Sequence, residues 1–154
     1  MTKLVFRLAT VEDTTPLIKK FALPLAKDIT DRSGLTPDEH GITHFITNFI
    51  ASNTKPLLAC HGKKIAGALL VVKDKLFYAQ EPVLLDFGLY IQEKYKDTDL
   101  QGENIASKLT EWAINIARAN NLIYLPSNIT GDPYLDQVYQ SLGGQYLGGR
   151  WKLQ

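Results

Sequence analysis

The spacing of hydrophobic and polar residues changes several times along the chain, from the alternation of strands to the period of helices. Residues 3–9 (KLVFRLA) alternate and are apolar enough to predict a β-strand. A helix is expected directly after it, with start signals at Thr10 and Asp13, and Pro24 is expected to end it because proline cannot continue a helix interior. The chain is therefore predicted to begin with a strand and a helix.

The next segment carries a clear signal for a second helix. Thr36 is expected to cap it, Pro37 suits the first helical position, and Glu39 completes a capping box three residues after Thr36. The apolar residues that follow have helical spacing and should share one face: Ile42, Phe45, Ile46, Phe49 and Ile50.

Two β-rich runs, residues 56–72 and 75–91, predict an antiparallel meander of three strands. His61 and Gly62 supply the chemistry of the first turn, and residues 73–75 are expected to form the second reversal. Strict alternation in the third strand predicts one face with Val83, Leu85, Phe87, Leu89 and Ile91, and the other with Leu84, Asp86, Gly88 and Tyr90.

The second half of the chain predicts a β-α-β unit. An apolar stripe predicts a helix over residues 101–119, and residues 122–126 (LIYLP) read as a short strand. Because a crossover helix makes the strands on either side of it parallel, strand 122–126 should run parallel to strand 83–91. The helix should then begin near the carboxyl edge of the sheet.

A last helix and a last strand are expected to close the chain. Asp132 can cap a helix with Pro133 at its first position, and Gly143 should end it. Residues 145–153 are predicted as a strand with a glycine interruption. The fold class is thus α/β, one domain over residues 1–154, with an antiparallel meander, a parallel β-α-β half and four flanking helices.

Composition narrows the classes of function. Seventeen Lys and Arg against sixteen Asp and Glu leave a net charge of +1, so no strong overall field favours nucleic acid as a partner. The single cysteine, Cys60, excludes an internal disulfide, and the chain has no apolar N-terminal run of signal-peptide type, which favours the cytoplasm. No stretch reaches 18 consecutive apolar residues, so no membrane span is expected.

The segment QGENIA, residues 101–106, is a candidate anion site. A helix start exposes unpaired N–H groups and the positive end of the helix dipole, which suit a phosphate or pyrophosphate. Gly102 and Ala106 are small, so the anion could approach the backbone, and Gln101 can donate a hydrogen bond. The hexapeptide by itself also fits an ordinary loop and helix start, and both interpretations stay open.

Two motifs, in their order along the chain, resemble the GNAT superfamily of acyl-CoA-dependent N-acyltransferases. The family's Gln/Arg-x-x-Gly-x-Gly/Ala motif falls on Gln101, Gly102, Glu103, Asn104, Ile105 and Ala106, with Asn104 where the family has glycine. The stretch DPYLDQVYQSLGG is similar to the family's N-x-x-A-x-x-x-Y-x-x-x-G-F, which places Asp132, Tyr139 and Gly143 on its asparagine, tyrosine and glycine.

The resemblance implies a function and a set of site residues. It implies transfer of an acetyl group from acetyl-CoA, as co-substrate, to a primary amine by direct attack. The pyrophosphate would bind at residues 101–106, and the backbone of Leu89, Tyr90 and Ile91 would pair with the pantetheine arm. Tyr139 would protonate the departing thiolate; a tyrosine on the apolar face of a helix is the alternative for this residue.

The general base is argued from the residues themselves. Asp86 is the best candidate because it is predicted to face away from the apolar side of its strand, where partial burial raises a carboxyl pKa. Glu81, water and a purely structural role for Asp86 remain alternatives. His40 and His44 lie four residues apart, but no third ligand is evident, so no metal is expected.

A second class of function stays open. Asn104 in the glycine position and Gly144 in the aromatic position also fit a GNAT-like module that binds or supports without catalysis. The acceptor amine is not identified by any motif. A homodimer is compatible with the family resemblance.

Overall fold

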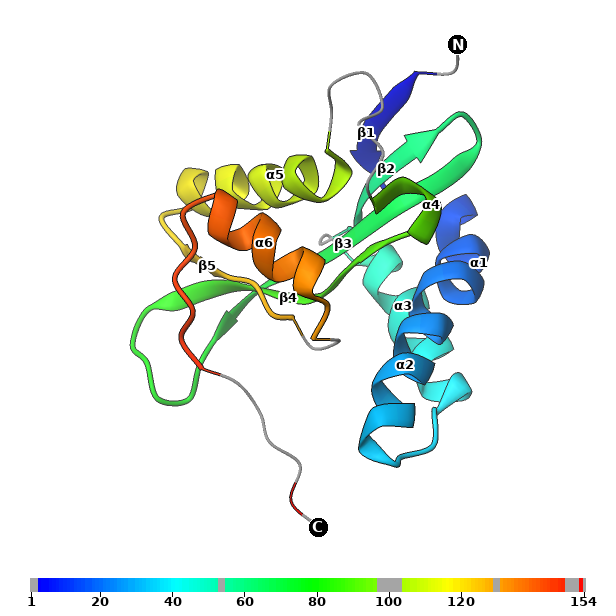
Figure 1. The fold of residues 1–154 in the computed structure, drawn as a ribbon, viewed down its shortest axis with the longest axis horizontal. Coiled ribbons are helices and arrows are strands. Elements are labelled where there is room, and N and C mark those ends of the chain that lie inside the picture. Colours follow the sequence, from blue (N-terminus) through cyan, green and yellow to red (C-terminus); the bar gives the residue numbers. More distant parts are fainter. Residues whose placement is uncertain (1–2, 53–54, 97–103, 129–130, 149–152, 154) are drawn as a thin grey trace.

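A computed structural model of the protein describes residues 3–52, 55–96, 104–128, 131–148 and 153. The described strands form one mixed sheet in the spatial order β1-β2-β3-β4-β5, in which the first four are antiparallel neighbours and β5 is parallel to β4 (Figure 1). The bounds of the strands are β1 Leu4–Leu8, β2 Leu57–His61, β3 Lys64–Lys75, β4 Pro82–Ile91 and β5 Ile123–Leu125.

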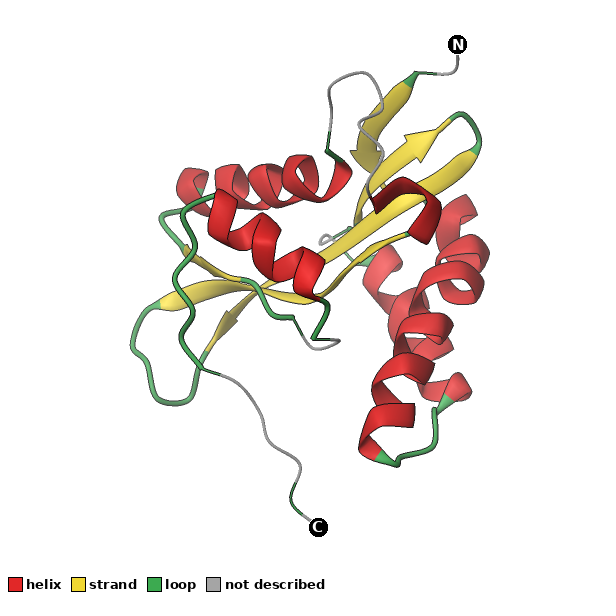
Figure 2. Ribbon diagram, viewed as in Figure 1, coloured by secondary structure: helices red, strands yellow, loops and turns green. Residues whose placement is uncertain are grey.

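Helices cover both faces of this sheet (Figure 2). The helices before β2 pack on one face, and α5 and α6 pack on the other. The bounds are η1 Val11–Asp13, α1 Thr14–Leu17, η2 Ile18–Ala22, α2 Leu23–Ser33, α3 Glu39–Ala51, α4 Glu93–Lys96, α5 Ile105–Ala119 and α6 Pro133–Ser141. The mixed α/β fold predicted from the sequence is confirmed, and the described residues add the short helix α4 to the four that were expected.

The first helix begins where the sequence predicts. Asp13 accepts a hydrogen bond from the backbone N–H of Thr10 over 2.7 Å, and Arg7 holds the same carboxylate through two nitrogens at 2.7 and 2.8 Å. Hydrogen bonds from Arg7 are the largest cause that lowers the pKa of Asp13, against the opposing effect of burial. The helix start is thereby tied to β1.

The expected end of this helix at Pro24 is wrong. The helical rod continues through Pro24 to Ser33, because the π-helical turn η2 ends at Ala22, two residues before the proline. In that turn the N–H of Leu23 bonds the carbonyl of Ile18, five residues back. A wider turn leaves room for a proline ring that would collide with the carbonyl four residues before it in a regular α-helix.

Two other local predictions are corrected. Helix α3 is capped by Asp38, not Thr36, since the Asp38 carboxylate accepts the N–H of Gly41 over 2.9 Å and the helix begins at Glu39. The second reversal of the meander also lies later than residues 73–75, which belong to β3 and pair with β4; Asp74, for example, is opposite Val83. The bond from Gly41 to Asp38 fixes the start of α3, and pairing with β4 fixes the length of β3.

A β-bulge in β4 corrects the predicted division of its faces. Leu70 lies opposite Gly88, and Val71 lies opposite Asp86, so Phe87 is an extra residue. Side chains after the bulge therefore point to the opposite face from the one that strict alternation predicts. Leu84, Leu89 and Ile91 all pack in the core beneath α5, and Asp86 is on their face, where it bonds to Tyr124 of the same core.

The aromatic side chain at the bulge turns the other way. The ring of Phe87 lies 5.2 Å from that of Phe45 and 6.2 Å from that of Phe49, both on α3. Gly88 has φ of +141°, a conformation that glycine adopts without strain. The bulge thus directs Phe87 to α3 while it leaves Asp86 on the side of α5 and α6.

The second half of the chain follows its prediction except at the end. β5 pairs in parallel with β4 over residues 83–85, α6 begins at the predicted cap Asp132, and Gly143 follows the helix with φ of +83°. Residues 145–148, expected to start a final strand, form no strand, and Tyr146 and Leu147 are largely exposed. Residues 149–152 of that expected strand lie outside the described part of the chain.

Candidate functional site

Parallel pairing, which joins β4 to the edge strand β5, is short. β5 is opposite β4 only at residues 83–85, so from Asp86 onward the described residues give β4 no strand partner on that edge. Residues 126–128 follow β5 beside this edge, where Ser127 bonds to Asp86. A strand edge without a partner presents N–H and C=O groups to whatever lies beside it.

A cavity of about 560 Å³, here called the polar cavity, opens at the carboxyl end of β4. It is lined from β4 by the three residues predicted to pair with pantetheine: Leu89, Tyr90 and Ile91. Its other walls come from α2, α4 and the start of α6, through Pro24, Leu25, Asp28, Arg32, Glu93, Lys96, Asp132 and Leu135.

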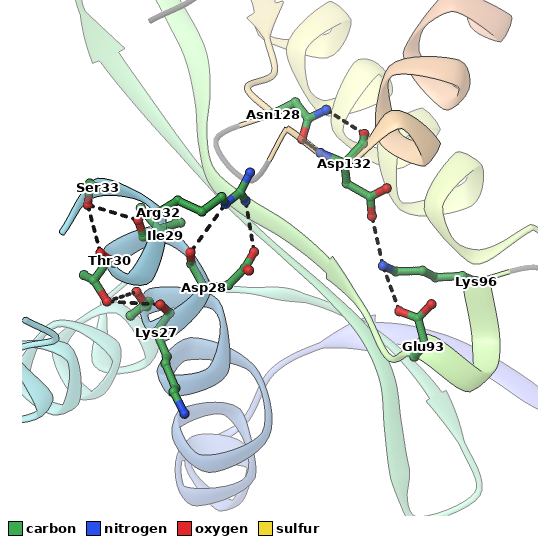
Figure 3. Close-up of polar contacts among 11 residues, drawn as sticks. Lys27, Asp28, Ile29, Thr30, Arg32, Ser33, Glu93, Lys96, Asn128 and Asp132 are labelled. Carbon is green, nitrogen blue, oxygen red and sulfur yellow. Dashed lines mark hydrogen bonds and ion pairs between the residues drawn. The ribbon is translucent and has the colours of Figure 1, made fainter. Parts of the chain in front are cut away.

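Ion pairs arrange the charged walls of the polar cavity (Figure 3). Lys96 Nζ lies 2.9 Å from Asp132 Oδ2 and 3.0 Å from Glu93 Oε2, and Arg32 lies 3.0 Å from Asp28 Oδ2. Partial burial works against the charged form of Lys96, but hydrogen bonds to the two carboxylates raise its pKa. Lys96 therefore joins α4 to the capped start of α6.

Asp86 lies in a hydrogen-bonded cluster at the end of β5. Its Oδ1 accepts hydrogen bonds from the Ser127 hydroxyl at 2.7 Å and the Ser127 N–H at 3.1 Å, and its Oδ2 accepts one from the Tyr124 hydroxyl at 3.3 Å. Only 8% of Asp86 is exposed. Burial raises the pKa of Asp86 to about 6, although the hydrogen bonds from Ser127 and Tyr124 act in the opposite direction.

Tyr139 joins the same cluster from α6. Its hydroxyl donates to the carbonyl of Ser127 over 3.3 Å. Burial, and then the nearby charge of Asp86, raise the pKa of Tyr139, so its hydroxyl stays protonated at neutral pH. The two residues predicted as acid and base are thus brought together through one serine, while neither is among the described residues that line the polar cavity.

Sequence reasoning missed Tyr124 and Ser127. A signal for them existed in the predicted parallel pairing, since Tyr124 is opposite Leu84 and the chain after it must run beside Asp86. The alternative base Glu81 lies before the first residue of β4, eight residues from Leu89. At the rise of an extended strand this separation is roughly 25 Å, too far for a shared site.

The candidate anion site is described only from Asn104 onward; Gln101, Gly102 and Glu103 lie outside the described residues. Asn104 caps α5, because its Oδ1 accepts the N–H of Ser107 over 2.9 Å, and its Nδ2 donates to the Tyr134 hydroxyl at 3.0 Å. One of the N–H groups at this helix start therefore already has an acceptor within the chain.

Ile105 and Ala106 have buried side chains in the core beneath α5. The side chain at 106 is thus part of the core, a role that the sequence motif did not indicate. Only the backbone at these two positions is suited to an anion.

Two further observations concern a metal ion and a membrane. Among the described residues, no group of three His, Cys, Asp or Glu side chains could hold a metal ion. No described helix has both the length and the apolar character of a membrane span.

Comparison with solved structures identifies the fold. A predicted acetyltransferase with acetyl-CoA from Clostridium acetobutylicum is 17% identical with a TM-score of 0.67, over 99% of this chain and 96% of that one. A transcriptional regulator from Bacillus halodurans C-125 is 18% identical with a TM-score of 0.71, over 99% of both chains. AAC(6')-Iy in complex with a bisubstrate analog is 9% identical with a TM-score of 0.70, over 99% and 98%.

No protein-family model and no curated protein sequence matches the chain. The structural likeness nevertheless extends over almost the whole length of each chain. The protein therefore has the fold of the GNAT superfamily, as its two motifs predict.

Proposed function

We propose that the protein is an acyl-CoA-dependent N-acyltransferase that transfers an acetyl group from acetyl-CoA to a primary amine. The observation that carries this proposal is the edge of β4 beyond Leu85, which has no described strand partner and leads into the polar cavity at Leu89, Tyr90 and Ile91. The amide groups of a pantetheine arm match the hydrogen-bonding groups of such an edge.

The reaction needs positioning and two proton transfers. An acceptor in its ammonium form first releases one proton to water; the neutral amine nitrogen then bonds to the thioester carbonyl carbon, the carbon–sulfur bond breaks, the amine loses a proton and the thiolate gains one. We assign the role of accepting the proton of the attacking amine to Asp86, whose pKa of about 6 leaves it mostly a carboxylate at neutral pH. We assign the role of protonating the thiolate to Tyr139, whose hydroxyl is protonated and lies in the same cluster.

Calorimetry tests the proposal directly. Acetyl-CoA titrated into the purified protein should bind with a dissociation constant in the micromolar range, and the absence of heat at high micromolar ligand would refute the proposal. Backbone amide signals locate the site: those of Leu89, Tyr90 and Ile91 should shift on binding. The amides of β1, at the opposite edge of the sheet, serve as the internal control and should stay in place.

A non-catalytic GNAT-like module is the second candidate. It is favoured by the Asn104 side chain at the start of α5 and by Tyr139, whose hydroxyl is bonded to Ser127 and which is not among the described residues that line the polar cavity. An assay of free thiol release against a panel of primary amines distinguishes the two candidates. Coenzyme binding without thiol release would favour the module, and release above the rate of hydrolysis would favour the enzyme.

A further inference from the structure

A second cavity, here called the apolar cavity, lies on the other face of the sheet. Its volume is about 360 Å³, within the usual range for small-molecule sites, and it is lined by residues of α1, η2, α2, α3 and strands β3 and β4. Phe21, Ile42, Phe45 and Leu70 are typical of its walls. Asp38 is the one acidic or basic residue among the described residues that line it.

The apolar cavity adjoins the polar cavity. Leu25 on α2 and Tyr90 on β4 line both of them, so the two cavities are direct neighbours. The junction is fixed by close packing: a Cβ at Gly88 would lie 2.9 Å from Leu25 Cδ2, and the Tyr90 ring packs edge-on against Phe21 at 5.0 Å. The two cavities therefore meet at Leu25 and Tyr90, just beyond the β4 bulge.

The two cavities differ in charge. The described walls of the polar cavity carry three carboxylates against two cations, and so have one negative charge in excess. In the apolar cavity, the Asp38 carboxylate already accepts the N–H of Gly41 at the start of α3. A ligand with several ammonium and hydroxyl groups would lose its hydration in the apolar cavity, where Asp38 is the one charged partner among the described lining residues.

We propose that the acceptor is a primary amine with one apolar alkyl or aryl group, which lies in the apolar cavity while the ammonium group points into the polar cavity. This inference rests on the proposed acyltransferase function. The hydrocarbon gains from burial against the walls from α2 and α3, and the cation gains from the excess of carboxylates. An acyl chain of the donor has no charge, and so does not account for that excess.

Binding of simple amines to the free protein tests the inference without any reaction. Hexylamine should bind at least tenfold more tightly than ethylamine in calorimetry, and more tightly than hexanol, which has the chain without the charge. Equal affinities for the two amines, or for hexylamine and hexanol, would overturn the proposal.

A filled cavity gives the matched test. Ala26 lines only the apolar cavity, and Ala26→Leu should remove the advantage of hexylamine over ethylamine. Ala119→Leu places the same side chain at an exposed position at the end of α5 and should leave that advantage unchanged. The same effect in both variants would contradict the proposal.

Two further measurements complete the experiment. Hexylamine should shift the methyl signals of Ala68 and Leu70 but not those of Ala113, which packs on the opposite face. This measurement uses the unmodified protein, and so holds even if Ala26→Leu does not fold.

Hexanoyl-CoA and acetyl-CoA should bind Ala26→Leu with the same relative affinity as the unmodified protein. A selective loss for hexanoyl-CoA would assign the apolar cavity to the donor and overturn the inference. If no coenzyme binds at all, the proposed function fails, whereas the amine measurements still decide what the apolar cavity binds.

Discussion

The hydroxyl of Ser127 donates a hydrogen bond of 2.7 Å to the carboxylate of Asp86, and the Ser127 carbonyl accepts one from Tyr139. Ser127, which follows β5, thus connects the buried carboxyl group of Asp86 on β4 with the buried phenol of Tyr139 on α6. Because burial outweighs the hydrogen bonds that stabilise its charge, Asp86 keeps a raised pKa of about 6. This combination makes the cluster sensitive to pH in a range where most carboxylates are not.

The first prediction concerns stability against pH. Asp86 holds its proton more tightly in the folded protein than in the unfolded chain, where its pKa is near 3.8. Stability is therefore lost as pH rises from about 4 to about 6, because the unfolded chain gives up this proton first. A shift of this size corresponds to about 3 kcal/mol in the free energy of unfolding.

Asp86→Asn removes this titration and keeps an oxygen for Ser127. Urea unfolding at pH 4.5 and pH 7 should show that the variant gains stability relative to the unmodified protein as pH rises. The comparison must be made between the two proteins, because Asp13 and Asp132 have lowered pKa values and contribute the opposite slope in both. Parallel pH profiles for the two proteins would show that Asp86 does not titrate in this range.

The second prediction concerns the proposed acid. Tyr139→Phe should lower the rate constant for thiol release by about 10²-fold, the lower end of what a general acid supplies. The dissociation constant of acetyl-CoA should not change, because the hydroxyl contacts the Ser127 carbonyl and does not line the polar cavity. Loss of that buried hydrogen bond should lower the free energy of unfolding by about 1 kcal/mol. If the variant is less stable but its turnover is unaltered, Tyr139 has a structural role and is not the acid.

The fold was predictable because most of its elements carry local signals that agree with their tertiary contacts. The capped start of α6 at Asp132 and the β-α-β crossover through α5 are examples, since turn chemistry and apolar periodicity indicate the same boundaries that packing selects. Pro24 is the opposite case. Its local signal ends a helix, but the π turn before it lets the rod continue, and no sequence pattern announces that turn.

The arrangement of the candidate site could not be predicted from the sequence. Strict alternation predicted which residues of β4 share a face with Asp86. The bulge at Phe87 breaks this alternation, so the residues that share its face could not be derived from spacing. A bulge is a property of the pairing of two strands. The contacts with Tyr124 and Ser127 likewise depend on the register of β4 and β5.

The third prediction concerns the glycine at the bulge. Gly88→Ala should lower the free energy of unfolding by about 2 kcal/mol, because alanine is strained at φ of +141° and its Cβ would lie 2.9 Å from Leu25 Cδ2. Gly148→Ala is the matched control: φ is +138°, but nothing lies within 4 Å of the added Cβ, and the exposed chain around it can relax. Urea unfolding of both variants measures the difference, and equal losses would show that contact with Leu25 contributes nothing.

The last prediction concerns the start of α5. The Asn104 side chain accepts the N–H of Ser107, and so takes a donor that a bound pyrophosphate would otherwise use. Asn104→Gly should therefore tighten acetyl-CoA binding several-fold. It should lower the free energy of unfolding by less than about 1 kcal/mol, since glycine replaces asparagine at a helix cap at little cost.

Tyr134→Phe separates the two contacts of Asn104. It removes the hydroxyl that lies 3.0 Å from Asn104 Nδ2 but leaves the cap on Ser107 in place, so the affinity for acetyl-CoA should stay as it is. Calorimetry on the two variants decides which contact matters. If Asn104→Gly weakens binding while Tyr134→Phe does not, the asparagine itself holds the anion, and its amide replaces the backbone approach that a glycine allows.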